Sequence, residues 1–255
     1  MRVRISDPEE FARALVARFA LSTPTDLDEL AAKLDLQIKE VDSHGFEGAL
    51  VRINQRRGGG IAVRKNIREL GRKRFTIAHE IGHYILPGHG EYHCKSDHIE
   101  SWRQGLPSQE EAANRFASEL LLPALAIYRV VQKNSLTLST VQALSEQFHT
   151  SLTATALKCV EVTEESCAVV MSKNRVIEWV RSTDSFRLYL PKGGRLDEDT
   201  HAMRLANNPG ERCKDGFVSA SAWIGAHHPS SSMRIWEDSI ALPYYDSVLT
   251  ILTMT

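Results

Sequence analysis

The sequence predicts a mixed α+β protein, with a helix-rich first half and a β-rich final third. Apolar residues recur at helical spacing in two stretches, around 75–85 and 109–122, which indicates buried helices. From Cys167 onward the pattern changes to short β-rich runs separated by turns. The chain has 255 residues, of which 42% are hydrophobic and 25% charged, so it is long enough for two or three modest domains with buried cores.

The chain opens with two predicted amphipathic helices, over about 7–19 and 26–34. A turn at Thr23-Pro24-Thr25 precedes the second helix. Glycines then lead into a predicted strand over 58–64, for which residues 46–53 are the expected antiparallel partner. This strand runs directly into the helix that carries the most informative motif.

Basic residues are concentrated between positions 52 and 74, where the only acidic residue is Glu69. Such a cluster could attract an acidic protein or the phosphates around a DNA-bound one, or it could be an ordinary solvated face. The second reading is favoured. The cluster consists of Arg52, Arg56, Arg57, Arg64, Lys65, Arg68, Arg72, Lys73 and Arg74.

The motif itself is His79-Glu80-Ile81-Gly82-His83, which has the H-E-x-x-H pattern. Residues four apart share one face of a helix, so His79 and His83 can ligate one Zn²⁺. Glu80 then lies beside the coordination position left for water and is the expected catalytic base. The expected reaction is hydrolysis of a peptide bond by water that the metal activates.

A catalytic zinc site needs a third protein ligand, and the next predicted helix, over 109–122, supplies two acidic candidates. Glu110 shares a face with Ala113, Asn114 and Ala117, whose small side chains allow close approach to the His79 helix, and it is therefore the expected ligand. Glu111 is the alternative, about 100° around the helix. Asn114 is either a partner that orients a ligand or a buried packing amide.

A donor for the oxyanion of the tetrahedral intermediate is also expected, but the sequence does not identify it. Four side chains lie near the motif, and none is assigned: Tyr84, His89, His93 and His98.

The segments RFTIAHEIGHYIL and EEAANRFASELLLP together resemble the ImmA/IrrE family of bacterial metallopeptidases. The resemblance covers roughly residues 1–130. It implies a zincin-like peptidase core with the gluzincin ligand set, in which His79, His83 and Glu110 bind Zn²⁺ and Glu80 is the base; such sites also accept Mn²⁺ or Fe²⁺. In zincin-like enzymes an edge strand binds the substrate as an added strand. The predicted strand 58–64 is given this role, with an ordinary buried hairpin as the alternative.

Two further helices, over 139–148 and 151–162, are separated by a break at His149-Thr150, as in a helix-turn-helix. Residues 134–162 contain only one lysine or arginine, Lys158. Because phosphate contacts dominate affinity for DNA, this pair of helices is expected to be a structural connector without direct DNA binding.

The C-terminal part is predicted to form two strand pairs, 168–172 with 175–180 and 234–242 with 248–253. Residues 191–195 and 205–215 are interpreted as long loops. The layout of the ImmA/IrrE family implies three domains: a peptidase domain at 1–130, a helix-turn-helix-like linker at 131–163 and a GAF-like α+β sensor domain at 164–255. His201, Trp223, His227 and His228 are interpreted as surface or packing residues.

No stretch has the length and apolarity of a membrane span or signal peptide, so a cytoplasmic location without membrane association is expected. The four cysteines lack paired metal-binding spacing and are expected to be reduced thiols: Cys94, Cys159, Cys167 and Cys213.

The resemblance implies regulated proteolysis. Members of the family cleave a helix-turn-helix transcriptional repressor of the XRE type and so relieve repression of stress-response or mobile-element genes. The DNA damage response is among the stress responses expected. The expected function is therefore a zinc-dependent, site-specific endopeptidase, with the C-terminal unit either sensing an unknown signal or docking the substrate. The alternative is a non-catalytic regulator that uses its metal for structure and sequesters a repressor. A DNA-binding regulator is a third, less favoured class.

Overall fold

The computed structural model describes residues 7–53, 58–89, 92–94, 108–208, 210–224 and 233–254. It confirms a mixed α+β fold with a sheet in the C-terminal part. The chain forms two compact units. Unit 1 contains Met1–Ala126 with Leu144–Thr155, and unit 2 contains Ile127–Ala143 with Ala156–Thr255. The division into domains at 1–130, 131–163 and 164–255 stays a prediction.

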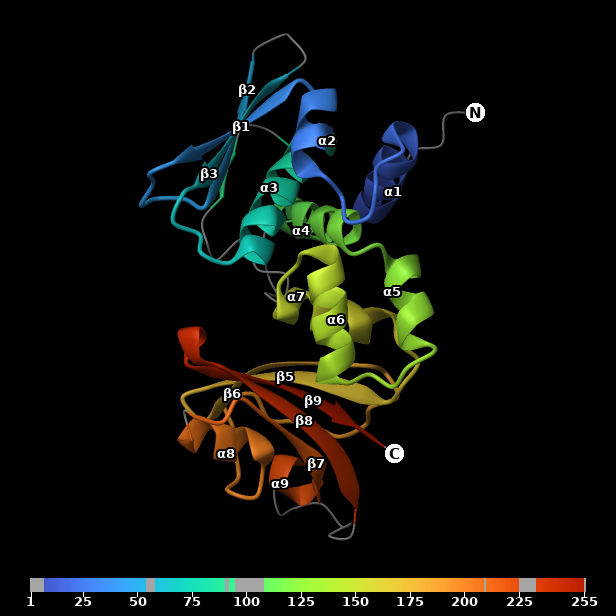
Figure 1. The fold of residues 1–255 in the computed structure, drawn as a ribbon, viewed down its shortest axis with the longest axis vertical. Helices are drawn as coiled ribbons and strands as arrows, with labels where there is room; N and C mark the ends of the chain where they lie inside the picture. Colours follow the sequence, from blue (N-terminus) through green and yellow to red (C-terminus); the bar gives the residue numbers. More distant parts are fainter. Residues whose placement is uncertain are drawn as a thin grey trace. The chain divides into compact units, whose positions relative to one another are not determined.

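Unit 1 contains a sheet whose described strands have the order β1-β3-β2-β4 (Figure 1). Strands β1 (Leu36–Val41) and β3 (Gly59–Arg64) are parallel, whereas β2 (Gly48–Arg52) is antiparallel to both β3 and β4 (Tyr92–Cys94). The predicted pairing of 46–53 with 58–64 is therefore confirmed.

The role of strand 58–64 as a substrate-binding edge was predicted wrongly. Strand β3 has a hydrogen-bonded partner on each side, β1 and β2, so its backbone cannot accept an added strand. The prediction missed β1, whose Leu36 is buried while the rest of the strand is partly or fully exposed. Within the described residues, β1 and β4 are the outer strands of this sheet.

The two N-terminal helices form where the sequence predicts them, at α1 (Pro8–Phe19) and α2 (Leu27–Lys33). Each begins after an aspartate that caps it: Asp7 Oδ1 accepts from the N–H of Glu9, and Asp26 Oδ1 from the N–H groups of Asp28 and Glu29. Their apolar faces join the core of unit 1 through Leu15 and Leu30, among others.

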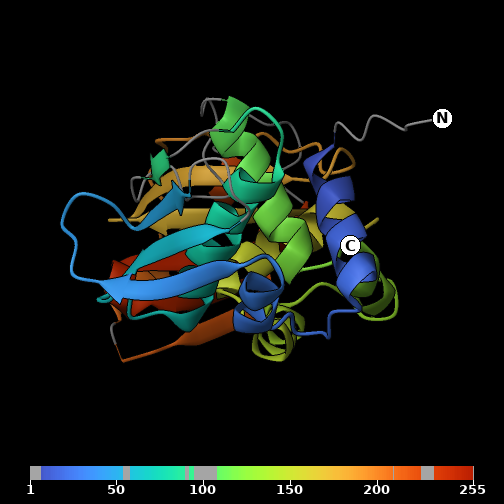
Figure 2. The ribbon, with the colours of Figure 1, turned by 90° about the horizontal axis from the view of Figure 1, so that it is seen from above.

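Helices α3 (Leu70–Ile85) and α4 (Ser108–Leu121) pack closely side by side (Figure 2). Gly82 of α3 makes this possible, because a Cβ there would lie 3.1 Å from the ring of Phe116 and 3.3 Å from the backbone of Ala113. The small residues of α4 at the contact are those expected from the sequence: Ala113 and Ala117 are fully buried.

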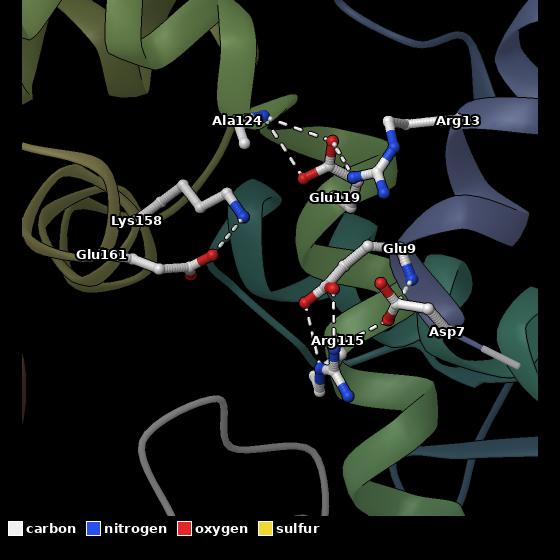
Figure 3. A network of polar contacts seen from close by, with 8 residues as sticks. All are labelled: Asp7, Glu9, Arg13, Arg115, Glu119, Ala124, Lys158 and Glu161. Atoms are coloured by element: carbon white, nitrogen blue, oxygen red, sulfur yellow. Dashed lines mark hydrogen bonds and ion pairs between the residues drawn. The ribbon is translucent and has the colours of Figure 1, made fainter.

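Ion pairs connect α4 with α1 (Figure 3). Arg115 Nη2 lies 2.7 Å from Asp7 Oδ1 and 2.6 Å from Glu9 Oε2. Near the other end, the buried carboxylate of Glu119 contacts Arg13 at 3.3 Å and accepts from the N–H of Ala124, the first residue of α5 (Ala124–Val131). Glu119 therefore caps α5 and joins α4 to α1.

Helices α6 (Leu138–Phe148) and α7 (Leu152–Val162) form within one residue of the predicted bounds. His149 ends α6 in the left-handed region, at φ 52°. The turn between the helices packs against the start of α3, because a Cβ on Gly71 would lie 2.2 Å from the nitrogen of Ser151.

Unit 2 contains an antiparallel sheet of order β6-β5-β9-β8-β7. Its strands are β5 (Cys167–Lys173), β6 (Val176–Ser182), β7 (Cys213–Ser219), β8 (Arg234–Leu242) and β9 (Ser247–Thr253). The four predicted strands are confirmed as β5, β6, β8 and β9. Asn174 and Arg175 form the β5–β6 turn, both with positive φ, at 51° and 63°.

Helices α8 (His201–Asn207) and α9 (Ser221–Ile224) cover one face of this sheet, and a short 3₁₀ helix, η1 (Pro243–Tyr245), joins β8 to β9 (Figure 1). The predicted loop at 205–215 is wrong, because it contains the end of α8 and the start of β7. Buried His201 and Trp223 are packing residues, as expected, whereas His227 and His228 lie outside the described residues. In the described part of the chain, no helix is long and apolar enough to cross a membrane.

Candidate metal centre

Helix α3 places the whole H-E-x-x-H motif in the interior of unit 1. His79, Glu80 and His83 are each fully buried. The apolar stripe predicted for this helix, including Phe75, Ala78 and Ile81, is buried as well, so the helix contributes both core and site. Burial removes competing water from the histidine rings and fixes their directions.

Three side chains converge at one point: His79, His83 and Glu110, whose ligand atoms all lie within 4.8 Å of one another. The two Nε2 atoms are 3.0 Å apart. Glu110 Oε2 lies 3.2 Å from Nε2 of His79, and Glu110 Oε1 lies 3.6 Å from Nε2 of His83. Ligands about 2.0–2.2 Å from a tetrahedral cation are roughly 3.3–3.6 Å apart, so this donor set fits one divalent metal ion such as zinc.

The ring of His79 is held by Asn114 on α4. Its Nδ1 donates to Oδ1 of Asn114 over 2.8 Å, which leaves the lone pair of Nε2 directed at the centre. Burial lowers the pKa of His79 below its usual value, against the adjacent carboxylate of Glu110, which raises it. Of the two roles considered for Asn114, the contact supports the orienting one.

His83 is held in a different way, by the ring of His89 just beyond α3. The two Nδ1 atoms are 2.8 Å apart, so one donates and the other accepts. Burial, together with the nearby His83, lowers the pKa of His89 to about 4, so its ring is neutral at pH 7. His89 is one of the four candidates for the oxyanion donor, but its Nδ1 faces the ring of His83 instead.

Glu110 and not Glu111 faces the centre. Glu110 is buried, whereas Glu111 is exposed one residue further along α4. Burial by itself raises the pKa of Glu110, but the adjacent rings of His79 and His83 outweigh it and hold that pKa well below its usual range. The carboxylate is therefore ionised, as a metal ligand must be.

Glu80 faces strand β2 across Gly48. A Cβ on Gly48 would lie 2.4 Å from Glu80 Oε1 and 2.7 Å from Cγ2 of Thr76, so only glycine leaves room for this carboxylate. The requirement was not foreseen, because a glycine inside a strand does not reveal which helix packs on it.

Arg52, at the end of β2, is a second residue whose role the sequence does not reveal. Its Nη2 donates to the backbone oxygens of His83 at 2.6 Å, Tyr84 at 3.1 Å and His89 at 3.4 Å. The hydroxyl of Tyr84 accepts from the N–H of Gly58. Of the other two residues considered as oxyanion donors, His98 lies outside the described residues, and so does the side chain of His93.

Much of the basic cluster at 52–74 is occupied within unit 1. Arg64 and Arg72 contact the buried carboxylate of Glu47, at 2.5 and 3.1 Å. Lys73 pairs with Glu40, and Arg74 donates to the backbone oxygen of Thr25. Arg56 and Arg57 lie outside the described residues. These contacts weaken the case for an anionic partner at this cluster.

Lys158, the only lysine or arginine of the helix-turn-helix-like pair, is buried on α7. Its Nζ lies 2.8 Å from the carboxylate of Glu161 (Figure 3). A buried and paired ammonium contributes little to phosphate binding. The expectation that these helices do not bind DNA by themselves therefore stands as a prediction.

Fold and site define the class of this protein: a mixed α+β chain with a candidate His-His-Glu metal centre. The profile of the IrrE N-terminal-like domain (Peptidase_M78) matches residues 31–159. The chain therefore belongs to the ImmA/IrrE family, as its sequence motifs predict, and this family suggests a metallopeptidase.

Among solved structures, the chain is similar to a Mycobacterium tuberculosis transcriptional regulator. The TM-score is 0.59 at 14% sequence identity, and the match covers 98% of this chain and 76% of the regulator. At this identity the likeness shows the fold alone. No curated protein gives a significant match.

Proposed function

We propose that this protein is a zinc-dependent, site-specific endopeptidase that cleaves an XRE-type helix-turn-helix repressor and so derepresses stress-response genes. The observation that carries the proposal is the convergence of His79, His83 and Glu110 on one point, with Glu80 adjacent on the same helix. Family membership supports a peptidase, and the regulator-like fold is consistent with a role in transcription.

Each residue of the candidate site has its own role in the proposed reaction. His79, His83 and Glu110 would hold Zn²⁺, with Mn²⁺ or Fe²⁺ also compatible with the donors. Such a cation supplies Lewis-acid chemistry, polarising the scissile carbonyl and acidifying water. Glu80 accepts a proton from water at its carboxylate and passes it to the leaving amine. Asn114 keeps His79 in the tautomer that points Nε2 at the metal position.

The C-terminal sheet unit is proposed to be a GAF-like domain that senses a signal, and the N-terminal unit a zincin-like core. Because β3 is internal, an extended substrate would have to pair with an outer strand of the first sheet, and β4 follows α3 directly in the chain. Backbone hydrogen bonds to such a strand would hold the substrate extended without requiring a particular side chain.

Glu80→Gln tests the catalytic step. The amide keeps the size of the side chain but cannot accept the proton, so cleavage should fall by about 10²–10⁴-fold while zinc stays bound. The substrate for this assay is a purified XRE-type repressor from the same genome, sought first in the neighbouring reading frame, and the readouts are peptide mass spectra and zinc content. Glu111→Gln, an exposed change one residue from Glu110, is the matched control and should alter neither readout.

The same pair of proteins separates catalysis from sequestration. If Glu80→Gln relieves repression as well as the wild type does, and neither protein cleaves the repressor, the chain acts by binding and the peptidase proposal is wrong. If Glu80→Gln still cuts at the wild-type rate, another group is the base.

A further inference from the structure

We propose that Arg52 and His89 are positioning residues that together hold the metal ligand His83, Arg52 through the backbone and His89 through the ring. This inference rests on the proposed metal site but not on the identity of the substrate. It assigns a role to two side chains outside the H-E-x-x-H motif, one on β2 and one in the loop after α3.

The need for Arg52 follows from where α3 ends. The last carbonyls of a helix have no partner within it, and His83 lies in this last turn. The N–H of Leu86 satisfies Gly82, and Arg52 satisfies the next two carbonyls, those of His83 and Tyr84. A guanidinium at this position also complements the negative end of the helix dipole.

Arg52 is itself held in place. Its guanidinium carbon lies 5.0 Å from the centre of the Tyr84 ring, a cation–π contact, and the Tyr84 hydroxyl is fixed by the N–H of Gly58. The same Nη2 reaches the carbonyl of His89 at 3.4 Å. Arg52 therefore ties the turn that carries His83 to the loop that carries its ring partner.

The ring contact fixes the tautomers. To bind a metal through Nε2, neutral His83 must carry its hydrogen on Nδ1, so Nδ1 donates to Nδ1 of His89 over 2.8 Å. His89 must then carry its own hydrogen on Nε2. An imidazole thus takes the place of the carboxylate, carbonyl or water that usually accepts from a metal-bound histidine.

Zinc affinity of the full chain tests this without any substrate. Competition with a colorimetric chelator should give a zinc Kd about 10–100-fold weaker for His89→Ala than for the wild type. His89→Asn places an amide oxygen near the former Nδ1 and should restore most of the affinity. His44→Ala, which removes an exposed histidine of the same unit, is the matched control and should bind zinc as the wild type does.

Arg52→Lys tests the proposed role of Arg52. It keeps the charge, but one ammonium cannot replace the planar fork, so zinc affinity should fall and the visible spectrum of the Co²⁺-substituted protein should change. Lys65→Ala, at an exposed cation of the same stretch, is the control. Melting of the metal-free variants shows whether they are folded.

Several results would overturn the proposal. One is a zinc Kd for His89→Ala equal to that of His44→Ala; another is a loss that His89→Asn does not restore. Ring nitrogen NMR of the zinc-loaded protein gives an independent reading, because a hydrogen on Nδ1 of His89 would contradict the proposed ring contact. A wild type that binds zinc yet cleaves no repressor would instead overturn the peptidase function and leave the proposed roles of Arg52 and His89 unaffected.

Discussion

Gly48→Ala is expected to damage catalysis more than metal binding. The new Cβ would lie 2.4 Å from Glu80 Oε1, whereas ordinary contact begins at 3.4 Å, so the carboxylate or the strand must move by about 1 Å. Overpacking of this kind costs about 1–3 kcal/mol, partly offset by the about 0.4–1 kcal/mol that Gly→Ala gains by restricting the unfolded chain. A net loss of about 1–2 kcal/mol should lower the melting temperature by roughly 2–8 °C.

The effect on activity should be larger, because a displacement of about 1 Å at a reacting group can cost about 10²-fold in rate. The zinc Kd should stay close to that of the wild type, since the three atoms nearest to the added Cβ belong to Glu80 and Thr76. Thermal melting, zinc competition and repressor cleavage measure these three quantities separately.

Gly60→Ala is the matched control for this prediction. Gly60 lies in the neighbouring strand of the same sheet, but its Cβ would meet its nearest atom at 3.8 Å, which is ordinary contact. It should therefore be neutral or slightly stabilising. Equal stability and equal cleavage in the two variants would refute the claim that the space at Gly48 is needed by Glu80.

Three further predictions concern the framework around the site. Gly71→Ala should lower the free energy of unfolding by about 3 kcal/mol or more, because the added Cβ would meet the backbone at Ser151. An unchanged midpoint of chemical denaturation would contradict that packing. Glu119→Ala should lower stability by about 1–3 kcal/mol in chemical denaturation, since Ala124 loses its cap and Arg13 its partner; Glu111→Ala is the comparison. Burial raises the pKa of Cys159 and of Cys167 to about 12, so at pH 8 iodoacetamide should label exposed Cys213 and spare both of them; labelling of all three at equal rates in the native protein would refute this.

The convergence of His79, His83 and Glu110 can be predicted from the sequence because most of the information is local. His79, Glu80 and His83 lie within two turns of one helix, and the face of α4 is readable from Glu110, Ala113 and Ala117. Helical periodicity converts such spacings into directions. Only the distance between the two helices is non-local, and Gly82 indicates that it is short.

The missed features depend in large part on partners far away in the sequence. Strand β1 is defined by parallel pairing with β3 across about 23 residues, a contact that no local pattern encodes. Helix α8 has a local cap, since the hydroxyl of Thr200 accepts from the N–H of Met203. Its other support is distant: the N–H of Ala202 donates to the buried carboxylate of Glu237, which also accepts from Trp223. The Asn-Pro-Gly composition at 207–210 favoured a loop instead.

Local sequence patterns and long-range contacts together determine the position of α3. Three glycine positions bring backbone or bulky groups against it: Gly48 from β2, Gly82 toward α4, and Gly71 toward the turn after α6. A helix fixed on three sides cannot rotate or slide without disturbing a sheet, a helix and a turn at once. His79, His83 and Glu80 all lie on this helix, so their relative positions are set by packing that requires no metal. The geometry of the candidate ligands is therefore preorganised, and a bound metal would add to the stability of the fold without having to create it.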